Sequence, residues 1–147
     1  MTAKKLIKRL NLARRDMSII ISRVEGMKLK AEVDGFTIIT GQIDETIPAE
    51  GPSPGRLMVA SLGLCAEFYA ALYLKKHKIS DEGLTVEIKE TNGQNPSRAI
   101  SFELEVKVKA KLTDDQKSGI MNNVQHCYVG NTMKGNPEIK YSLMVES

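Results

Sequence analysis

The sequence predicts an α+β domain in which antiparallel strands surround one long buried central helix and a second, shorter helix. Apolar and polar residues alternate without error from Ile100 to Leu112, which is typical of a half-buried strand. The segment from Leu57 to Leu74 is instead apolar on every face except at Ser61 and Glu67, which is typical of a core helix. A chain of 147 residues with 41% hydrophobic residues provides enough apolar material for one core.

The N-terminal segment, residues 1–15, is expected to lie outside this single domain, which we assign to residues 16–147. It carries lysines and arginines but no acid, and apolar residues recur at helical spacing from Leu6. We interpret it as a basic amphipathic helix that docks its apolar stripe on the domain, in preference to one that binds a membrane surface or an acidic partner.

A meander of three strands is predicted next. The strands are Met17–Ser22, Met27–Asp34 and Phe36–Thr40, and each shows apolar residues at alternate positions or β-branched enrichment. Turn signals at Glu25-Gly26 and Asp34-Gly35 separate them. One face of such a meander is buried and the other is solvated.

The long helix is predicted to run from Gly55 to His77, with Ser53 as its N-cap and Pro54 at its first position. Its apolar run is long enough to span a membrane, but we reject a span because Glu67 lies near its middle and small residues are frequent. In so short a chain, the strands rarely cover every face of a helix that is apolar all round. A second copy of the helix from a partner subunit would bury the remaining faces, so the pattern predicts a dimer. We expect Glu67 to pair with a basic residue across that interface, in preference to a catalytic role.

Two strands, a helix and a final strand complete the prediction. The strands are Leu84–Ile88 and Ile100–Leu112, and the capping-box spacing from Thr113 to Gln116 opens the second helix. The final strand is Ile139–Val145. The inner stripe of the second helix consists of Ile120, Val124 and Cys127.

Composition excludes several functions. A net charge of +3, with 5% aromatic residues and no Trp, gives no support for nucleic-acid binding. Two cysteines cannot form a disulfide framework, and two histidines cannot supply a His-rich metal site. No secretory signal opens the chain, so we expect a cytoplasmic protein, and in that reducing compartment paired cysteines are more often redox-active than structural.

Cys65 and Cys127 are the candidate site residues, because both are predicted to point inward from core-facing helices and can therefore meet. Periodicity alone favours two inert core thiols. Peroxide chemistry requires a thiolate, which needs a cationic neighbour or hydrogen-bond donors, and the middle of a helix offers no free N–H group. His126 is one such neighbour, although we favour an exposed histidine at a helix end.

Two motifs resemble those of the OsmC/Ohr family (osmotically inducible protein C and organic hydroperoxide resistance protein). The first runs from Gly51-Pro52-Ser53-Pro54 to Ala60-Ser61-Leu62-Gly63-Leu64-Cys65. The second is His126-Cys127-Tyr128-Val129-Gly130-Asn131-Thr132 with Gly135-Asn136-Pro137-Glu138-Ile139. The predicted order of elements also matches the family, from about Ser18 to Glu146.

The resemblance implies a thiol-dependent peroxidase of the oxidative stress response, built as an intertwined homodimer with its active sites at the subunit interface. Cys65 would attack a hydroperoxide and become a sulfenic acid, and Cys127 would condense with it to a disulfide that a dithiol reduces. No metal, haem or flavin takes part. An apolar pocket lined by Leu62, Phe68 and Tyr69 would suit a small apolar hydroperoxide.

The chain departs from the family at the start of the long helix. The resemblance implies a glutamate there that helps to hold an arginine beside the reactive thiolate, but this chain has Gly55 followed by Arg56. Arg23 is the nearest candidate for that arginine. The departure keeps two alternatives open: a redox-sensing or small-molecule-binding protein with little peroxidase turnover, and a structural domain whose cysteines are plain core residues.

Overall fold

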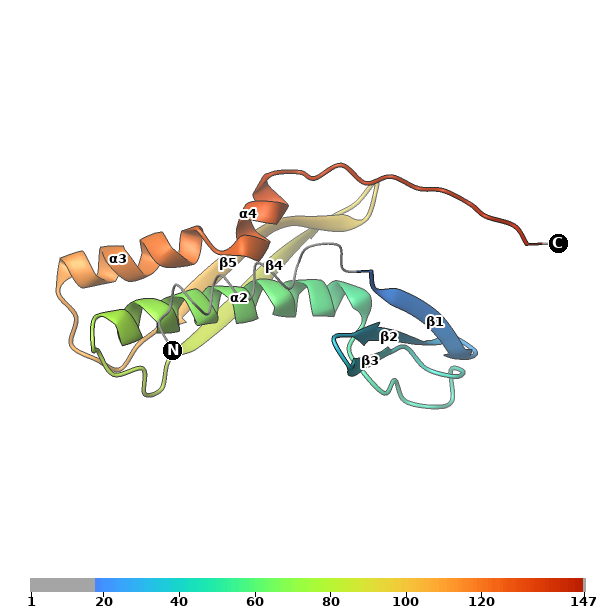
Figure 1. Cartoon of the computed structure of the whole chain (residues 1–147), viewed down its shortest axis with the longest axis horizontal. Helices are drawn as coiled ribbons and strands as arrows, with labels where there is room; N and C mark the ends of the chain where they lie inside the picture. The colour runs from blue at the N-terminus through green and yellow to red at the C-terminus, as the bar shows by residue number, and fades with distance from the viewer. Residues whose placement is uncertain (1–17, 147) are drawn as a thin grey trace. The chain divides into compact units, whose positions relative to one another are not determined.

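The computed structural model describes residues 18–146 and divides the chain into two compact units, one ending at Ala60 and the other beginning at Ser61 (Figure 1). The basic helix predicted for residues 1–15 lies outside the described residues. The assignment of residues 16–147 to a single domain stays a prediction. Each unit is built from antiparallel strands and helical residues, so the predicted α+β class is confirmed.

The first unit contains the predicted meander. Strands β1 (Ile20–Glu25), β2 (Lys28–Val33) and β3 (Phe36–Thr40) form an antiparallel sheet in the order β1-β2-β3. The β2–β3 turn places Asp34 at φ 50° and Gly35 at φ 81°. Two successive positive φ angles match the right-handed twist of the strands, which explains the Asp-Gly pair there.

One face of this sheet is apolar and exposed. The pairing places Ile21 opposite Ala31, and Ala31 opposite Ile38, so these three side chains share a face. Arg23 pairs with Leu29 on the same face. Ile21 is 60% exposed and Ile38 is 38% exposed, so the single chain leaves this face partly uncovered.

Helix α2 (Pro54–Lys76) confirms the predicted long helix and begins in the first unit. Leu62, Ala66, Ala70 and Leu74 recur every four residues and form its buried stripe. The expectation that the helix is buried on every face is not met within one chain, because Leu64 is 73% exposed. The helix is long and apolar enough to cross a membrane, but core helices pass the same test, and its buried stripe belongs to a hydrophobic core.

The second unit packs two helices and a hairpin around that core. Strands β4 (Thr85–Gly93) and β5 (Arg98–Lys107) pair antiparallel, and helix α3 (Asp114–Gln125) runs alongside α2 (Figure 1). Buried residues from the two helices form one cluster, and half-buried side chains of both strands pack against it. The cluster consists of Ala66, Ala70, Leu74, Ile120 and Val124.

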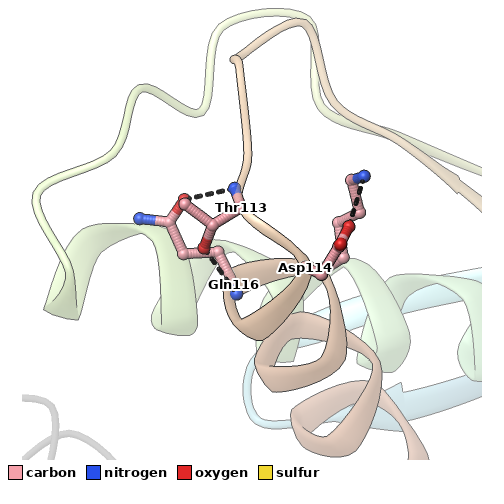
Figure 2. A network of polar contacts seen from close by, with 4 residues as sticks. Thr113, Asp114 and Gln116 are labelled. Atoms are coloured by element: carbon pink, nitrogen blue, oxygen red, sulfur yellow. Dashed lines mark hydrogen bonds and ion pairs between the residues drawn. The ribbon is translucent and has the colours of Figure 1, made fainter.

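The start of α3 follows the predicted capping box. The Thr113 side chain accepts a hydrogen bond from the Gln116 backbone N–H at 3.2 Å, and the Thr113 N–H donates to Gln116 Oε1 at 2.9 Å. Lys117 forms an ion pair with Asp114 at 2.9 Å in the same turn (Figure 2). Two backbone donors that a helix start leaves unsatisfied are therefore satisfied locally.

Several predicted strand extents are wrong, since β1 ends at Glu25 instead of Ser22 and β4 ends at Gly93 instead of Ile88. Strand β5 ends at Lys107 instead of Leu112, and residues 139–145 form no strand. Ile139 is 68% exposed and Leu143 is 88% exposed, so the apolar side of this segment is open. The alternating pattern is present, but a strand forms only where a neighbouring backbone pairs with it, and the described part of this chain does not supply that neighbour.

A short helix that was not predicted follows α3. Helix α3 ends at Gln125, and helix α4 (Tyr128–Lys134) begins after Cys127. Cys127 is therefore not the end of the α3 stripe, as the spacing had indicated, but the N-cap of α4.

Candidate thiol site

Cys65 lies in the middle of α2, next to the buried residue Ala66. Its side chain is half-buried and its thiol is free. Because the N–H groups around it are engaged in the helix, local backbone cannot stabilise its thiolate. The placement agrees with the prediction from the helical spacing.

Cys127 lies where the chain turns from α3 into α4. It has an extended backbone, with φ −65° and ψ 147°, and only 2% of its surface is exposed. Its Sγ accepts a hydrogen bond from the Gly130 backbone N–H at 3.3 Å, and its carbonyl accepts one from the Asn131 N–H at 2.9 Å. The thiol thus caps the helix that follows it, in the way a serine or aspartate side chain does elsewhere.

The two thiols meet. The Cys65 thiol is hydrogen-bonded to Cys127, although Cys65 lies in α2 and Cys127 lies in the turn between α3 and α4. Both residues belong to the second unit, and both are free thiols in this structure. The structure therefore brings into contact the two residues that the sequence selected, and a sulfur–sulfur bond between them requires such proximity.

The surroundings of Cys127 favour its neutral form. Burial raises the pKa of the Cys127 thiol, and the charge and hydrogen bond of Cys65 raise it further. The Gly130 N–H and the positive charge of Lys134 act in the opposite direction. Because burial is the largest of these effects, Cys127 is a protonated thiol in the resting protein.

Gly130 leaves room for the Cys127 sulfur. A Cβ atom at position 130 would lie 3.0 Å from Cys127 Sγ and 3.6 Å from Leu62 Cδ1. The first distance is shorter than a normal carbon–sulfur contact, so any larger residue would displace the thiol by a few tenths of an ångström. The glycine thus permits the close approach of its own N–H to the sulfur.

Two basic side chains lie near the turn. Lys134 donates from Nζ to the Gln125 carbonyl at 2.8 Å, which ties α4 to the end of α3. His126 is exposed, and its Nδ1 lies 2.7 Å from the Asn122 carbonyl. The histidine is therefore engaged with the last turn of α3, as expected for a residue at a helix end.

A cavity of about 460 Å³ opens beside Cys127. Its wall is largely apolar and comes from α2, β5, α3 and α4. Of the three residues predicted to line the pocket, Leu62 does so, whereas Phe68 and Tyr69 are not part of the wall. Those two rings contact each other edge-to-face at 5.8 Å. The wall consists of Leu62, Ser101, Phe102, Leu104, Met121, Val124, Gln125, Cys127, Gly130, Met133 and Lys134.

The remaining sequence candidates are placed as follows. Glu67 is half-buried on α2, and its partner across an interface stays a prediction. A Cβ atom at Gly55 would have nothing within 4 Å. Arg23 is exposed on β1 in the first unit. Among residues 18–146, no three His, Cys, Asp or Glu side chains gather as the ligands of a metal ion do.

The protein is an α+β protein in which two free thiols, one from helix α2 and one from the turn before α4, are in contact. The chain belongs to the OsmC-like protein family, whose model matches residues 47–142, well over half of the sequence. This family is the one that the sequence motifs resemble. No curated protein shows significant sequence similarity to the chain.

Solved structures confirm the fold. An OsmC-like protein from Mycoplasma pneumoniae is 18% identical, with a TM-score of 0.69 over 83% of this chain and 89% of its own. An organic hydroperoxide resistance protein from Elizabethkingia anophelis is 21% identical, with a TM-score of 0.52 over 84% of this chain and 92% of its own. An organic hydroperoxide resistance protein from Legionella pneumophila is 18% identical, with a TM-score of 0.53 over 84% of this chain and 93% of its own. At these identities the likeness concerns the fold alone.

Proposed function

We propose that this protein reduces organic hydroperoxides to alcohols, with Cys65 as the attacking thiol and Cys127 as the resolving thiol. The contact between the two sulfurs carries the proposal, because a two-thiol peroxidase needs a second thiol within reach of the oxidised one. Membership of the OsmC-like family supports it, and two structural relatives are named organic hydroperoxide resistance proteins.

The proposed cycle has three steps. The Cys65 thiolate attacks the terminal oxygen of the hydroperoxide, the O–O bond breaks, and the alkoxide leaves as the alcohol with one proton. The resulting sulfenic acid condenses with the Cys127 thiol, which forms the disulfide and releases water. A dithiol then reduces the disulfide and is itself oxidised to a disulfide.

The substrate class is inferred from the cavity beside Cys127, the thiol that Cys65 contacts. Its 460 Å³ volume and mostly apolar wall suit a hydroperoxide with a compact hydrocarbon group. We propose cumene hydroperoxide as the probe, because its apolar body matches that wall. We place the cycle in the cytoplasm, where a reducing thiol pool supplies the dithiol.

We propose that the protein works as a homodimer. The single chain exposes apolar residues on three separate elements: the β1–β3 sheet, the outer face of α2 and the segment 139–145. An exposed apolar surface of this extent marks an interface, and a second copy that exchanges strands would cover all three. The proposed interface also supplies the neighbouring backbone that the C-terminal segment needs in order to become a strand.

Gly55 supports a second candidate function, a redox sensor or small-molecule binder with little turnover. The family glutamate that orients the activating arginine is absent, and open space surrounds the position. Without that glutamate, no carboxylate at position 55 holds an arginine beside the Cys65 thiolate, and its reaction with peroxide would be slow.

The test is the consumption of cumene hydroperoxide with dithiothreitol as reductant. We expect the wild-type protein to turn over and Cys65→Ser to lose activity. Cys127→Ser should form no disulfide and should turn over only as fast as dithiothreitol reduces its Cys65 sulfenic acid directly. Cys127→Ala is the matched control for Cys127→Ser, because it also removes the sulfur but adds no hydroxyl. A wild-type rate no faster than that of Cys65→Ser would exclude the peroxidase and leave the sensor.

A further inference from the structure

We infer that Cys127 is the sulfur expelled when the disulfide is reduced, and that the backbone N–H of Gly130 stabilises the negative charge that develops on it. The inference rests on the proposed function for the existence of the Cys65–Cys127 disulfide. Beyond the proposed function, it assigns the sulfur that the reductant attacks and the N–H group that assists the departure of the other sulfur.

Burial assigns the direction of attack. An external thiolate must reach one sulfur of the disulfide in line with the S–S bond. Cys127 exposes 2% of its surface, whereas Cys65 is half-buried on the side of α2. Cys65 is the less buried residue of the pair, so we take its sulfur as the one attacked and the sulfur of Cys127, which lines only the cavity wall, as the one left behind.

The Gly130 N–H is already aimed at the departing sulfur. It donates to Cys127 Sγ at 3.3 Å in the reduced structure, in a partly buried environment. A hydrogen bond to a thiolate is stronger than one to a neutral thiol, so the same donor holds the product more tightly than the reactant. Lys134 lies on the wall of the same cavity and adds a positive charge at longer range.

The absence of a side chain at position 130 keeps this donor in place. A Cβ atom there would lie 3.0 Å from the sulfur and would push it away from the N–H. The backbone at this position does not have a positive φ, so alanine can adopt it. Alanine is also the better helix former, so Gly130→Ala changes the sulfur contact without weakening α4.

The step balances as a thiol–disulfide exchange. The reductant thiolate bonds to Cys65 Sγ, the Cys65–Cys127 bond breaks, and its electron pair stays on Cys127 Sγ as a thiolate. The second thiol of the reductant then attacks the mixed disulfide and releases Cys65. The dithiol has lost two electrons and the protein disulfide has gained them.

The first test locates the mixed disulfide. The protein is oxidised with diamide, which needs no peroxide, and is treated briefly with the monothiol 2-mercaptoethanol before acid quenching and peptide mass spectrometry. We expect the adduct on Cys65. An adduct on Cys127 would overturn the inference.

The second test measures the rate at which dithiothreitol reduces the diamide-oxidised protein. We expect Gly130→Ala to slow this reduction about threefold, as a rise of about one unit in the pKa of the leaving thiol would do. The rate at which diamide oxidises the reduced protein should change less. The matched control is Thr132→Ala, an exposed position of α4 away from the sulfur, which should leave both rates unchanged. Equal reduction rates for wild type and Gly130→Ala would refute the role of the donor.

The outcomes separate this inference from the proposed function. If diamide forms the disulfide but cumene hydroperoxide is not consumed, the peroxidase proposal fails. The role of Cys127 as the leaving sulfur is then still tested by the position of the mixed disulfide and by the rate of reduction with dithiothreitol. If diamide forms no Cys65–Cys127 disulfide, the two-thiol cycle and the inference fail together.

Discussion

Leu74 provides the sharpest test of how the second unit is held together. Its side chain is 0% exposed and lies in the cluster that joins α2 to α3. Leu74→Ala removes three carbon atoms, which at about 0.8 kcal/mol each amounts to about 2.4 kcal/mol of lost burial. The residual cavity adds to this, so we expect a loss of about 3 kcal/mol in the free energy of unfolding.

Urea denaturation at fixed protein concentration measures this loss, and a thermal melt should show a midpoint lower by about 10 °C. Leu74→Met is the matched control, because it conserves volume and should cost less than about 1.5 kcal/mol. A loss below about 1 kcal/mol for Leu74→Ala would refute the packing described for α2 and α3.

Three further predictions concern a cap, a titration and an interface. Thr113→Ala should lower the free energy of unfolding by about 1 kcal/mol in urea, because it removes the capping box of α3, and an unchanged midpoint would contradict that role. Because the pKa of Cys127 is raised in the folded protein, its thiol ionises at lower pH when the chain is unfolded. The free energy of unfolding should therefore fall as the pH rises above about 8.5. Under reducing conditions, this fall should be smaller for Cys127→Ser than for wild type. Leu64→Asp should shift the mass measured by light scattering from that of a dimer towards 16.3 kDa, because Leu64 lies on the exposed face of α2. A wild-type mass of 16.3 kDa at micromolar concentration would contradict the dimer itself.

The elements that the sequence predicts well are those whose signal is local. The β1–β3 meander, the long helix and the Thr113 capping box are each specified by neighbouring residues, through turn chemistry, apolar periodicity or a side chain that reaches three residues along the chain. The final strand at 139–145 fails in the single chain for the opposite reason. Its pattern is local, but its hydrogen-bond partner is not.

Helix α4 was missed because seven residues carry too little periodicity to distinguish a helix from a loop. Gly130 within it reads as a breaker, yet the helix is held by the Cys127 cap and by the bond from Lys134 to Gln125. The cap is local, but cysteine is not one of the usual N-cap residues, and the Lys134 bond joins residues nine positions apart.

The site shows the same division. Cys65 and Cys127 are recognisable because they are the only residues of their type. The placement of Cys65 follows from helical spacing, whereas that of Cys127 comes from the turn before α4. The Gly130 N–H has no chemical signal of its own, because every residue except proline carries the same donor. The pocket wall was only partly predicted, since Phe68 and Tyr69 share the helix of Leu62 but point elsewhere, and most of the wall comes from β5, α3 and α4. A glycine three residues after a cysteine at a helix start is the one pattern that could have indicated the donor.

The proposed bond between the Cys65 and Cys127 thiols is checked by treating the reduced protein with one equivalent of cumene hydroperoxide and mapping its peptides without reductant. We expect a single cross-linked peptide pair joining Cys65 to Cys127, with the intact mass lower by two hydrogen atoms, and no such pair in Cys65→Ser. Both thiols remaining free and alkylatable after the peroxide is added would contradict it.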